Sequence, residues 1–209
     1  MTVVAAVGLS FSARRSAIEG PLRIGLAAVL LGVTAGYLAM ETARGTLVVW
    51  DFVPLHLCDF AIFVAAFALI ARSARAAEVV YFWALSGTVL AMVMPAVSEA
   101  FPSARFLFYF GQHALVVIAA SVLVFGAGLR PRPGAPLRML IVTNAYAAFV
   151  AVVNLVADAN FLFLCEKPSV PTLLDYLGPW PLYILVGEAV ALGLFCVLNL
   201  PFWFARRAT

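Results

Sequence analysis

Hydrophobic residues occur in six long runs, and the short segments between them carry most of the charged residues. The runs cover residues 23–40, 54–70, 79–94, 106–126, 137–156 and 181–204. Each run is apolar on all sides, whereas a strand of a membrane β-barrel alternates polar and apolar residues. A helix needs roughly 20 apolar residues to cross a bilayer. The pattern therefore predicts an all-α polytopic membrane protein, folded as a bundle of six transmembrane helices.

The composition agrees with a membrane protein and excludes most other classes. Of 209 residues, 65% are hydrophobic and 11% are charged, whereas soluble proteins have roughly half and a quarter. A soluble, disordered, fibrous or disulfide-stapled secreted protein is therefore excluded. We expect one membrane domain over residues 1–209, with a surface segment at 1–20 and the bundle at 21–204. The apolar stretch at 2–11 is too short to span and lacks the basic residues that open a signal peptide.

The arginines predict the orientation of the bundle, because cytoplasmic loops are enriched in Lys and Arg. The N-terminus, the second and fourth loops and the C-terminus carry ten basic residues, and the other three loops carry three. The ten are Arg14, Arg15, Arg23, Arg72, Arg75, Arg130, Arg132, Arg138, Arg206 and Arg207; the three are Arg44, Arg105 and Lys167. We expect both termini in the cytoplasm, in a multi-pass protein of the cell membrane. Since the basic residues flank apolar runs, the net charge of +3 does not indicate a nucleic-acid partner.

Several polar side chains interrupt the apolar runs, where each ionisable group costs about 2.5–3.5 kcal/mol on insertion scales. In the predicted topology they all fall in the outer half of the bundle, which indicates a single site near the level of the lipid ester groups. At 1.5 Å per residue, Cys58 lies roughly 6 Å and His113 roughly 12 Å below the outer surface. The polar residues of this half are His56, Cys58, Asp59, His113, Asn154 and Glu188.

Cys58 and His113 are the candidates for chemistry. His56 and Asp59 are three residues apart and share a helix face, so Cys58 points elsewhere and its expected partner is His113 on another helix. A histidine beside a cysteine can take the thiol proton and leave a nucleophilic thiolate. The alternatives are a small packing cysteine and an interhelical hydrogen bond from His113.

Other interpretations of the same residues remain open. His56, Cys58, Asp59 and His113 are zinc-ligand types, but no close pair such as CxxC is present, and we expect no metal and no cofactor. A disulfide between Cys58 and Cys165 would remove the nucleophile in an oxidising exterior. Asn154 is either a bridge between helices or a donor to an oxyanion.

The outer segment at 158–180 supplies candidate contacts to a lipid headgroup. Trp180 fits the aromatic belt at a membrane interface. Lys167 and Arg105 are the candidates for a headgroup phosphate, because both are cations expected near that interface.

Six motifs together resemble the YwaF-like family of integral membrane proteins over roughly residues 20–204. They are Pro54-Leu-His-Leu-Cys58, Tyr81-Phe-Trp-Ala-Leu-Ser-Gly87, Phe110-Gly-Gln-His113, Asn154 with Ala159-Asn-Phe-Leu-Phe-Leu, Lys167-Pro168, and Leu174-Asp-Tyr-Leu-Gly-Pro-Trp-Pro-Leu-Tyr183. Animal relatives of that family look like Cys-dependent acyltransferases that make polyunsaturated ether phospholipids. A more distant resemblance, in layout, is to the androgen-induced-gene membrane hydrolases. Phe161 and Leu182 depart from the expected aromatic pattern, which affects substrate choice more than the Cys–His pair.

The resemblance implies an intramembrane acyltransferase that moves a fatty acyl chain between glycerophospholipids through a cysteine thioester. By motif, Cys58 is the nucleophile and His113 the base; phospholipid and lysophospholipid are the expected partners. The residues expected to line the substrate are His56, Asp59, Asn154, Asn160, Lys167, Arg105, Glu188 and Trp180. The alternatives are a membrane lipid hydrolase, a small-molecule transporter or binding protein, and a noncatalytic scaffold whose polar residues join helices.

Overall fold

The computed structural model describes residues 2, 6, 8–10, 16–46, 53–95, 97 and 99–207, and for 16–18 the backbone alone. These residues form helices and connecting loops, without a strand. The elements are α2 (Ser16–Arg44), α3 (Leu57–Ala71), α4 (Ala74–Trp83), η2 (Ala84–Thr88), α5 (Val89–Val93), α6 (Ala104–Ser121), η3 (Val122–Gly126), α7 (Ala135–Ala157), η4 (Phe161–Phe163), η5 (Leu173–Leu177) and α8 (Leu182–Arg207). The surface segment expected at 1–20 lies mostly outside the described residues.

Each predicted apolar run contains a helix, which confirms the all-α membrane fold. Among the described residues, five helices are long and apolar enough to cross a membrane. They cover Glu19–Arg44, Ala74–Val93, Ala104–Gly126, Ala135–Ala157 and Leu182–Arg207. α3 has 15 residues, or about 22 Å of rise, which is shorter than the roughly 30 Å hydrocarbon core. The structure therefore supports five full-length spans and one shorter apolar helix.

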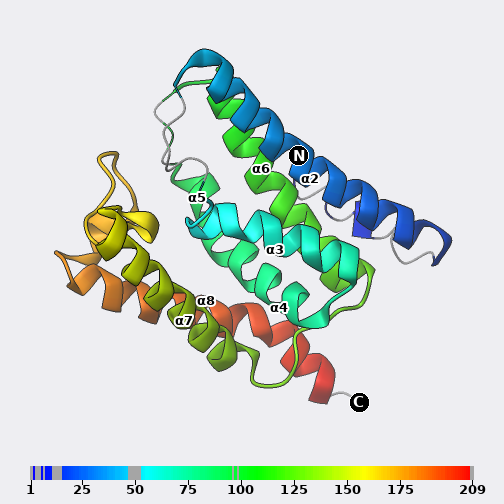
Figure 1. The fold of residues 1–209 in the computed structure, drawn as a ribbon. Helices are drawn as coiled ribbons and strands as arrows, with labels where there is room; N and C mark the ends of the chain where they lie inside the picture. The colour runs from blue at the N-terminus through cyan, green and yellow to red at the C-terminus, as the bar shows by residue number, and fades with distance from the viewer. Residues whose placement is uncertain are drawn as a thin grey trace.

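The six long helical segments alternate in direction (Figure 1). As a result, the start of α2 and the end of α8 lie at the same end of the bundle, together with the α3–α4 and α6–α7 links. The end of α2, the starts of α3 and α6, and the η4–η5 segment lie at the opposite end. The termini and the two loops that the sequence predicts to be cytoplasmic therefore lie at one end of the bundle.

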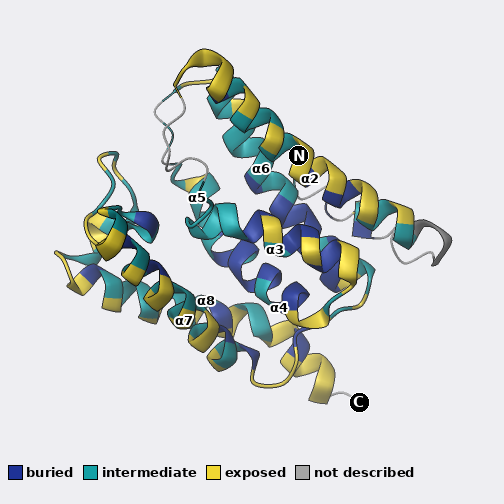
Figure 2. Ribbon diagram, in the orientation of Figure 1, coloured by how far each residue is buried: buried dark blue, intermediate teal, exposed yellow. Residues whose placement is uncertain are grey.

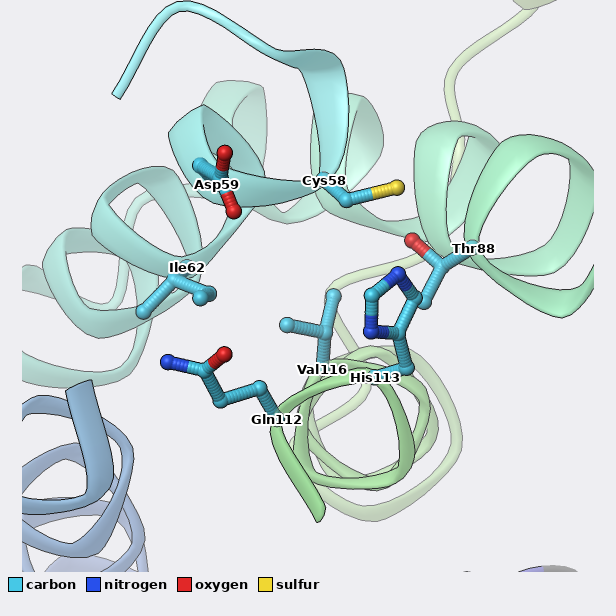
Figure 3. A pocket seen from close by; sticks show the side chains of 7 residues that line it. All are labelled: Cys58, Asp59, Ile62, Thr88, Gln112, His113 and Val116. Carbon is cyan, nitrogen blue, oxygen red and sulfur yellow. The ribbon is translucent and has the colours of Figure 1, made fainter. Parts of the chain in front are cut away.

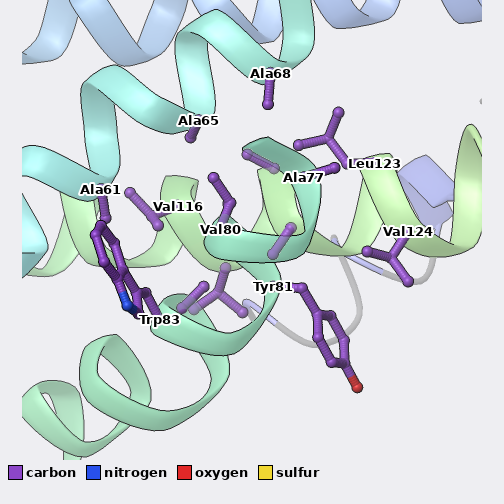
Figure 4. Packing of buried hydrophobic residues seen from close by; sticks show 14 of the residues in the cluster. Ala61, Ala65, Ala68, Ala77, Val80, Tyr81, Trp83, Val116, Leu123 and Val124 are labelled. Atoms are coloured by element: carbon purple, nitrogen blue, oxygen red, sulfur yellow. The ribbon is translucent and has the colours of Figure 1, made fainter. Parts of the chain in front are cut away.

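The buried centre of the bundle is formed mainly by α3, α4 and α6 (Figure 2). Small residues of α3, including Ala61, Ala65 and Ala68, face Ala77 and Val80 of α4 (Figure 4). Small side chains let two helix backbones approach closely, which is how membrane helices gain packing energy without a hydrophobic driving force. These alanines therefore hold α3 against α4 at the middle of the molecule.

A buried carboxylate joins elements at the end of the bundle that holds the α3–α4 and α6–α7 links. Glu78 of α4 accepts hydrogen bonds from Arg138 (2.7 Å) and Arg132 (3.1 Å), which belong to α7 and to the loop before it. At the opposite end, Arg105 of α6 is bonded to Glu41 of α2 and to Glu99 (3.1 Å). Each arginine thus neutralises a carboxylate at an end of the bundle.

Candidate functional site: a Cys–Thr–His cluster

Cys58 lies in the first turn of α3, where backbone N–H groups lack partners within the helix. His56 is the N-cap residue and makes no capping hydrogen bond with its side chain. The first N–H bonded back into the helix is that of Phe60, to the His56 carbonyl (3.0 Å). A helix start concentrates N–H donors and positive partial charge. The half-buried Cys58 thiol therefore lies beside backbone N–H donors at the start of α3.

His113 of α6 is held in one orientation by its own helix. Its Nδ1 lies 2.7 Å from the Tyr109 carbonyl oxygen. Because a carbonyl can only accept, Nδ1 carries the proton in the neutral ring, and Nε2 has the free lone pair. Figure 3 shows a ring nitrogen directed toward Cys58 and Thr88. His113 thus directs an unprotonated ring nitrogen toward the side of the pocket that holds the thiol and the Thr88 hydroxyl.

Thr88 completes the cluster from a third helix. Its hydroxyl faces the Cys58 thiol in the pocket (Figure 3), and the residue is 1% exposed. Helical hydroxyls often bond the carbonyl four residues back, as Thr34 (3.0 Å) and Ser121 (2.9 Å) do. Thr88 makes no such bond to Ala84 among the described contacts, and the Ala84 carbonyl instead accepts the N–H of Val89. The hydroxyl of Thr88 is therefore directed into the cluster.

The local backbone explains how Thr88 reaches Cys58. Thr88 ends η2, a π-helical turn inside the α4–α5 helix, and such turns reorient side chains and are frequent at functional sites. Gly87 lies against the start of α3: a Cβ there would be 3.3 Å from Leu57 Cδ2. The glycine thus permits the close approach of η2 to the first turn of α3.

These residues line one narrow pocket, drawn in Figure 3. Its empty volume is about 180 Å³, divided into gaps that do not take a water-sized sphere. Cys58, Thr88 and His113 are joined there by Asp59, Ile62, Gln112 and Val116. A molecule larger than these gaps must displace side chains to enter the pocket.

Gln112 has a defined orientation in this pocket. Thr34 donates its hydroxyl proton to the Leu30 carbonyl, so its oxygen accepts from Gln112 Nε2 (3.2 Å). This leaves Gln112 Oε1 as the acceptor on the pocket side (Figure 3). Gln112 therefore links α2 to the site and adds an acceptor to it.

The structure separates His56 from the other polar residues of its motif. His56 precedes α3, and its ring packs on Phe161 and Phe163 with centroids 5.4 and 5.2 Å apart. Burial lowers the pKa of His56. Asp59 lines the pocket with Cys58, so the predicted shared face of His56 and Asp59 does not describe their positions. The reason is that His56 lies outside the helical turn that places Cys58 and Asp59.

The asparagines of the outer segment serve its folding. Asn154 is 2% exposed; it donates to the Phe161 carbonyl (3.0 Å) and accepts from the Phe161 N–H (2.9 Å). Asn160 accepts from the Cys165 N–H (3.0 Å) and donates to the Glu166 carbonyl (2.9 Å). Both side chains hold the loop after α7 in shape. Asn154 therefore has its amide engaged, whereas the sequence interpretation offered it as an oxyanion donor.

The remaining predicted substrate contacts lie away from the Cys58 pocket. Trp180 donates to the Leu164 carbonyl (3.0 Å), and Lys167 lies 3.9 Å from Asp175 and over the Tyr183 ring. Arg105 is engaged by Glu41 and Glu99. Glu188 lines a separate crevice between α7 and α8. The structure thus brings Cys58, Asp59 and His113 together and places the other predicted residues elsewhere.

The structure also bears on the two alternatives for Cys58, a disulfide and a metal site. Cys58, Cys165 and Cys196 are free thiols, so the alternative disulfide between Cys58 and Cys165 is not formed. In the described part of the chain, no three His, Cys, Asp or Glu side chains gather as a metal-binding group. The pocket is a cluster of a thiol, a hydroxyl and an imidazole.

Thr88 and Gln112 were not among the predicted site residues. Thr88 follows the quoted motif that ends at Gly87, and a hydroxyl in an otherwise apolar run was the available signal. Gln112 directly precedes His113 in the motif Phe110-Gly-Gln-His113. Helical spacing alone does not place either residue, because a π-helical turn changes the face on which Thr88 lies.

Comparisons with known proteins identify the family of the chain. No curated protein and no solved structure matched it. The apolar helices and the family match together identify a multi-pass membrane protein. A sequence model of the TMEM164 family matches residues 1–199, nearly the whole chain, and the protein belongs to that family.

Proposed function

We propose that the protein is an intramembrane acyltransferase that moves a fatty acyl chain between glycerophospholipids through a thioester on Cys58. The observation that carries this proposal is the orientation of His113, whose Nδ1 is bonded to Tyr109 while its other ring nitrogen faces Cys58 and Thr88. The YwaF-like motifs, whose animal relatives resemble Cys-dependent acyltransferases, give the reaction class.

In the first step the thiol loses its proton and attacks the carbonyl carbon of a phospholipid ester. The Thr88 hydroxyl, which faces the thiol, passes the proton to His113 Nε2 by taking one proton and giving another. A bond forms between sulfur and the acyl carbon, and the carbonyl oxygen becomes an oxyanion. Backbone N–H groups of Leu57 and Cys58, in the first turn of α3, stabilise that oxyanion.

Collapse of the tetrahedral intermediate breaks the bond to the glycerol oxygen. His113 returns its proton to that oxygen, and a lysophospholipid leaves. In the second step the hydroxyl of another lysophospholipid gives its proton to His113 and attacks the thioester, which releases the thiolate. The thiolate is then reprotonated, so the cycle conserves atoms and needs no oxidant, metal or nucleotide.

The closed pocket favours transfer over hydrolysis, the second outcome of the same chemistry. The gaps around Cys58 do not take a water-sized sphere, while the surrounding helices present apolar surfaces that suit lipid. These apolar surroundings favour a lipid acceptor over bulk water at the mouth of the pocket.

The proposal includes a topology. We place α3 with the five longer helices as a sixth membrane helix and both termini in the cytoplasm of the cell membrane. The support is the excess of arginine at the end of the bundle that holds the start of α2 and the end of α8. The Cys58 pocket then lies in the outer half of the membrane.

A labelled phospholipid tests the thioester. After incubation with purified protein, labelled acyl chain should appear on the chain and be released by neutral hydroxylamine, which cleaves thioesters faster than oxygen esters. Cys58→Ala should abolish the label, whereas Cys165→Ala and Cys196→Ala, which remove the other free thiols, should keep it. Label that persists in Cys58→Ala would contradict the proposal.

The acceptor is tested on the labelled protein. Added lysophospholipid should discharge the label faster than buffer does, and the label should reappear in phospholipid. Discharge at equal rates with and without lysophospholipid, with the label recovered as free fatty acid, would make the protein a lipase.

A further inference from the structure

A second cavity lies between α7 and α8, under the outer segment that contains η4 and η5. Its empty volume is about 630 Å³, a figure that includes the open mouth. It shares no lining residue with the Cys58 pocket. The cavity, here called the α7–α8 crevice, is lined by Leu140, Thr143, Asn144, Ala147, Leu162, Phe163, Leu164, Leu174, Tyr183, Ile184, Gly187, Glu188 and Ala191.

Both helices build the crevice with the same spacing. The α7 residues recur at intervals of three and four from Leu140 to Ala147, and the α8 residues do so from Ile184 to Ala191. This spacing defines one face of a helix. Ala147, Gly187 and Ala191 are the small members of these two faces, and a Cβ on Gly187 would lie 3.9 Å from Leu177 Cδ1. The crevice is therefore open because small residues occupy the facing positions.

Glu188 is the ionisable group of this crevice, on an apolar helix. Among the described residues its carboxylate has no hydrogen bond and no ion pair. Lys167, a cation of the outer segment above it, is engaged with Asp175 and the Tyr183 ring. Acidic residues inside membrane spans are rare and mark binding sites or ion paths. A positively charged ligand would therefore complement the Glu188 carboxylate.

The other polar groups of the crevice complement a donor as well. The Asn144 amide nitrogen is bonded to the Leu140 carbonyl (3.1 Å), which leaves Asn144 Oδ1 as an acceptor. Tyr183 donates its hydroxyl proton to the Phe163 carbonyl. The Thr143 hydroxyl accepts a hydrogen bond from Trp83 Nε1 (2.8 Å). The other walls are apolar, and they suit a hydrocarbon chain better than a polar metabolite.

We propose that the α7–α8 crevice binds a long-chain amphiphile with a protonated primary amine. The ammonium group donates to Glu188 and to Asn144 Oδ1, and the alkyl chain lies along Leu140, Ala147 and Ala191. This site is separate from the Cys58 chemistry, and its test does not depend on acyl transfer.

The probe is dodecylamine with a photoactivatable diazirine in its chain. It is added to the full chain in phosphatidylcholine nanodiscs, whose lipid carries no primary amine. Cross-links should map to peptides that contain Asn144–Ala147 or Gly187–Ala191. Unlabelled dodecylamine should compete, and dodecanol should compete about tenfold less well, since it lacks the charge that strengthens a hydrogen bond. Equal competition by dodecanol, or cross-links confined to other helices, would overturn the proposal.

Two pairs of variants separate charge from space. Glu188→Gln should weaken labelling about tenfold, while Glu166→Gln, an exposed acid of the outer segment, should leave it unchanged. Ala147→Leu fills the crevice and should also reduce labelling; Ala148→Leu, on an exposed position one residue on, should not. Unchanged labelling in both Glu188→Gln and Ala147→Leu would refute the site. Thermal unfolding is measured for each variant as a control, to check that a loss of labelling does not come from a loss of fold.

Discussion

The indole nitrogen of Trp83 donates a hydrogen bond to the Thr143 hydroxyl at 2.8 Å, and this bond joins α4 to α7. Trp83 immediately precedes the π-helical turn that places Thr88, while Thr143 lines the α7–α8 crevice. The Trp83 ring also packs on Phe60 and Tyr146. One aromatic residue therefore connects the helix that carries Thr88 with the wall of the second cavity.

Removing this hydrogen bond should weaken the attachment of α7. Trp83→Phe keeps a ring but loses the donor, and we expect a loss of about 1 kcal/mol, the scale of interhelical hydrogen bonds in membranes. Thermal unfolding in detergent measures it. Thr143→Val removes the acceptor, and the double variant should be little worse than either single one. Fully additive losses would mean that the bond contributes nothing.

Removing the Glu78 carboxylate should be strongly destabilising. Its side chain is 2% exposed and is bonded to Arg132 and Arg138, so Glu78→Ala leaves two guanidinium groups without their partner. We expect a loss of about 3 kcal/mol, read from the unfolding temperature. Glu99→Gln is the matched control, because Glu99 pairs with Arg105 at 36% exposure and should cost less than about 1 kcal/mol. Equal costs would contradict the burial argument.

His113 should control the reactivity of Cys58. In a chain with Cys165→Ala and Cys196→Ala, a membrane-permeant maleimide reports Cys58 alone. His113→Ala should slow its alkylation at pH 7 by about tenfold or more, because the base that takes the thiol proton is lost. His56→Ala should change the rate little, since His56 packs against Phe161 and Phe163. Equal slowing by both variants would mean that the assignment of His113 as the base is wrong.

The hydroxyl of Thr88 should matter more than its shape. Thr88→Val keeps the branched side chain and removes the proton relay, so alkylation of Cys58 and acyl labelling should both slow. Thr88→Ser keeps the hydroxyl and should retain most of the rate. If Thr88→Val reacts as fast as the parent chain while His113→Ala is slow, the proton passes directly from thiol to imidazole.

Reporter fusions test the topology. A reporter after Arg207 should score as cytoplasmic, and one in the segment 158–168 should score as external, because the arginines gather at the end of the bundle that holds the end of α8. A reporter fused to a chain truncated after Ala71, at the end of α3, should score as cytoplasmic if α3 crosses the membrane. An external reporter at Arg207 would move the Cys58 pocket to the inner leaflet.

The helices were predictable because the bilayer imposes apolar runs of a set length. The run at 137–156 became α7 (Ala135–Ala157), and the run at 106–126 became α6 with η3. The second run was predicted to start at Pro54, but α3 begins at Leu57. Hydropathy does not detect that difference, because it is averaged over a window of roughly 19 residues, in which three residues change little.

Part of the site was predictable from the depth of its polar residues and from the motifs. Cys58 and His113 share a pocket, as expected from the depth of both residues and from the motifs. Asn154 and Arg105 are instead engaged by the chain itself, through contacts with residues far along the sequence or after a turn. Pairings such as Arg105 with Glu41, 64 residues apart, depend on which helices become neighbours, and local sequence patterns do not contain that information.

The shortness of α3 has a consequence for the lipid around the protein. A helix of about 22 Å beside helices of 20 to 26 residues creates hydrophobic mismatch, which a bilayer relieves by thinning locally. In the proposed topology the headgroups next to the start of α3 sink toward Cys58. The lipid ester groups then approach the thiol within the membrane plane, so the proposed acyl transfer would not require a lipid to be lifted out of the leaflet.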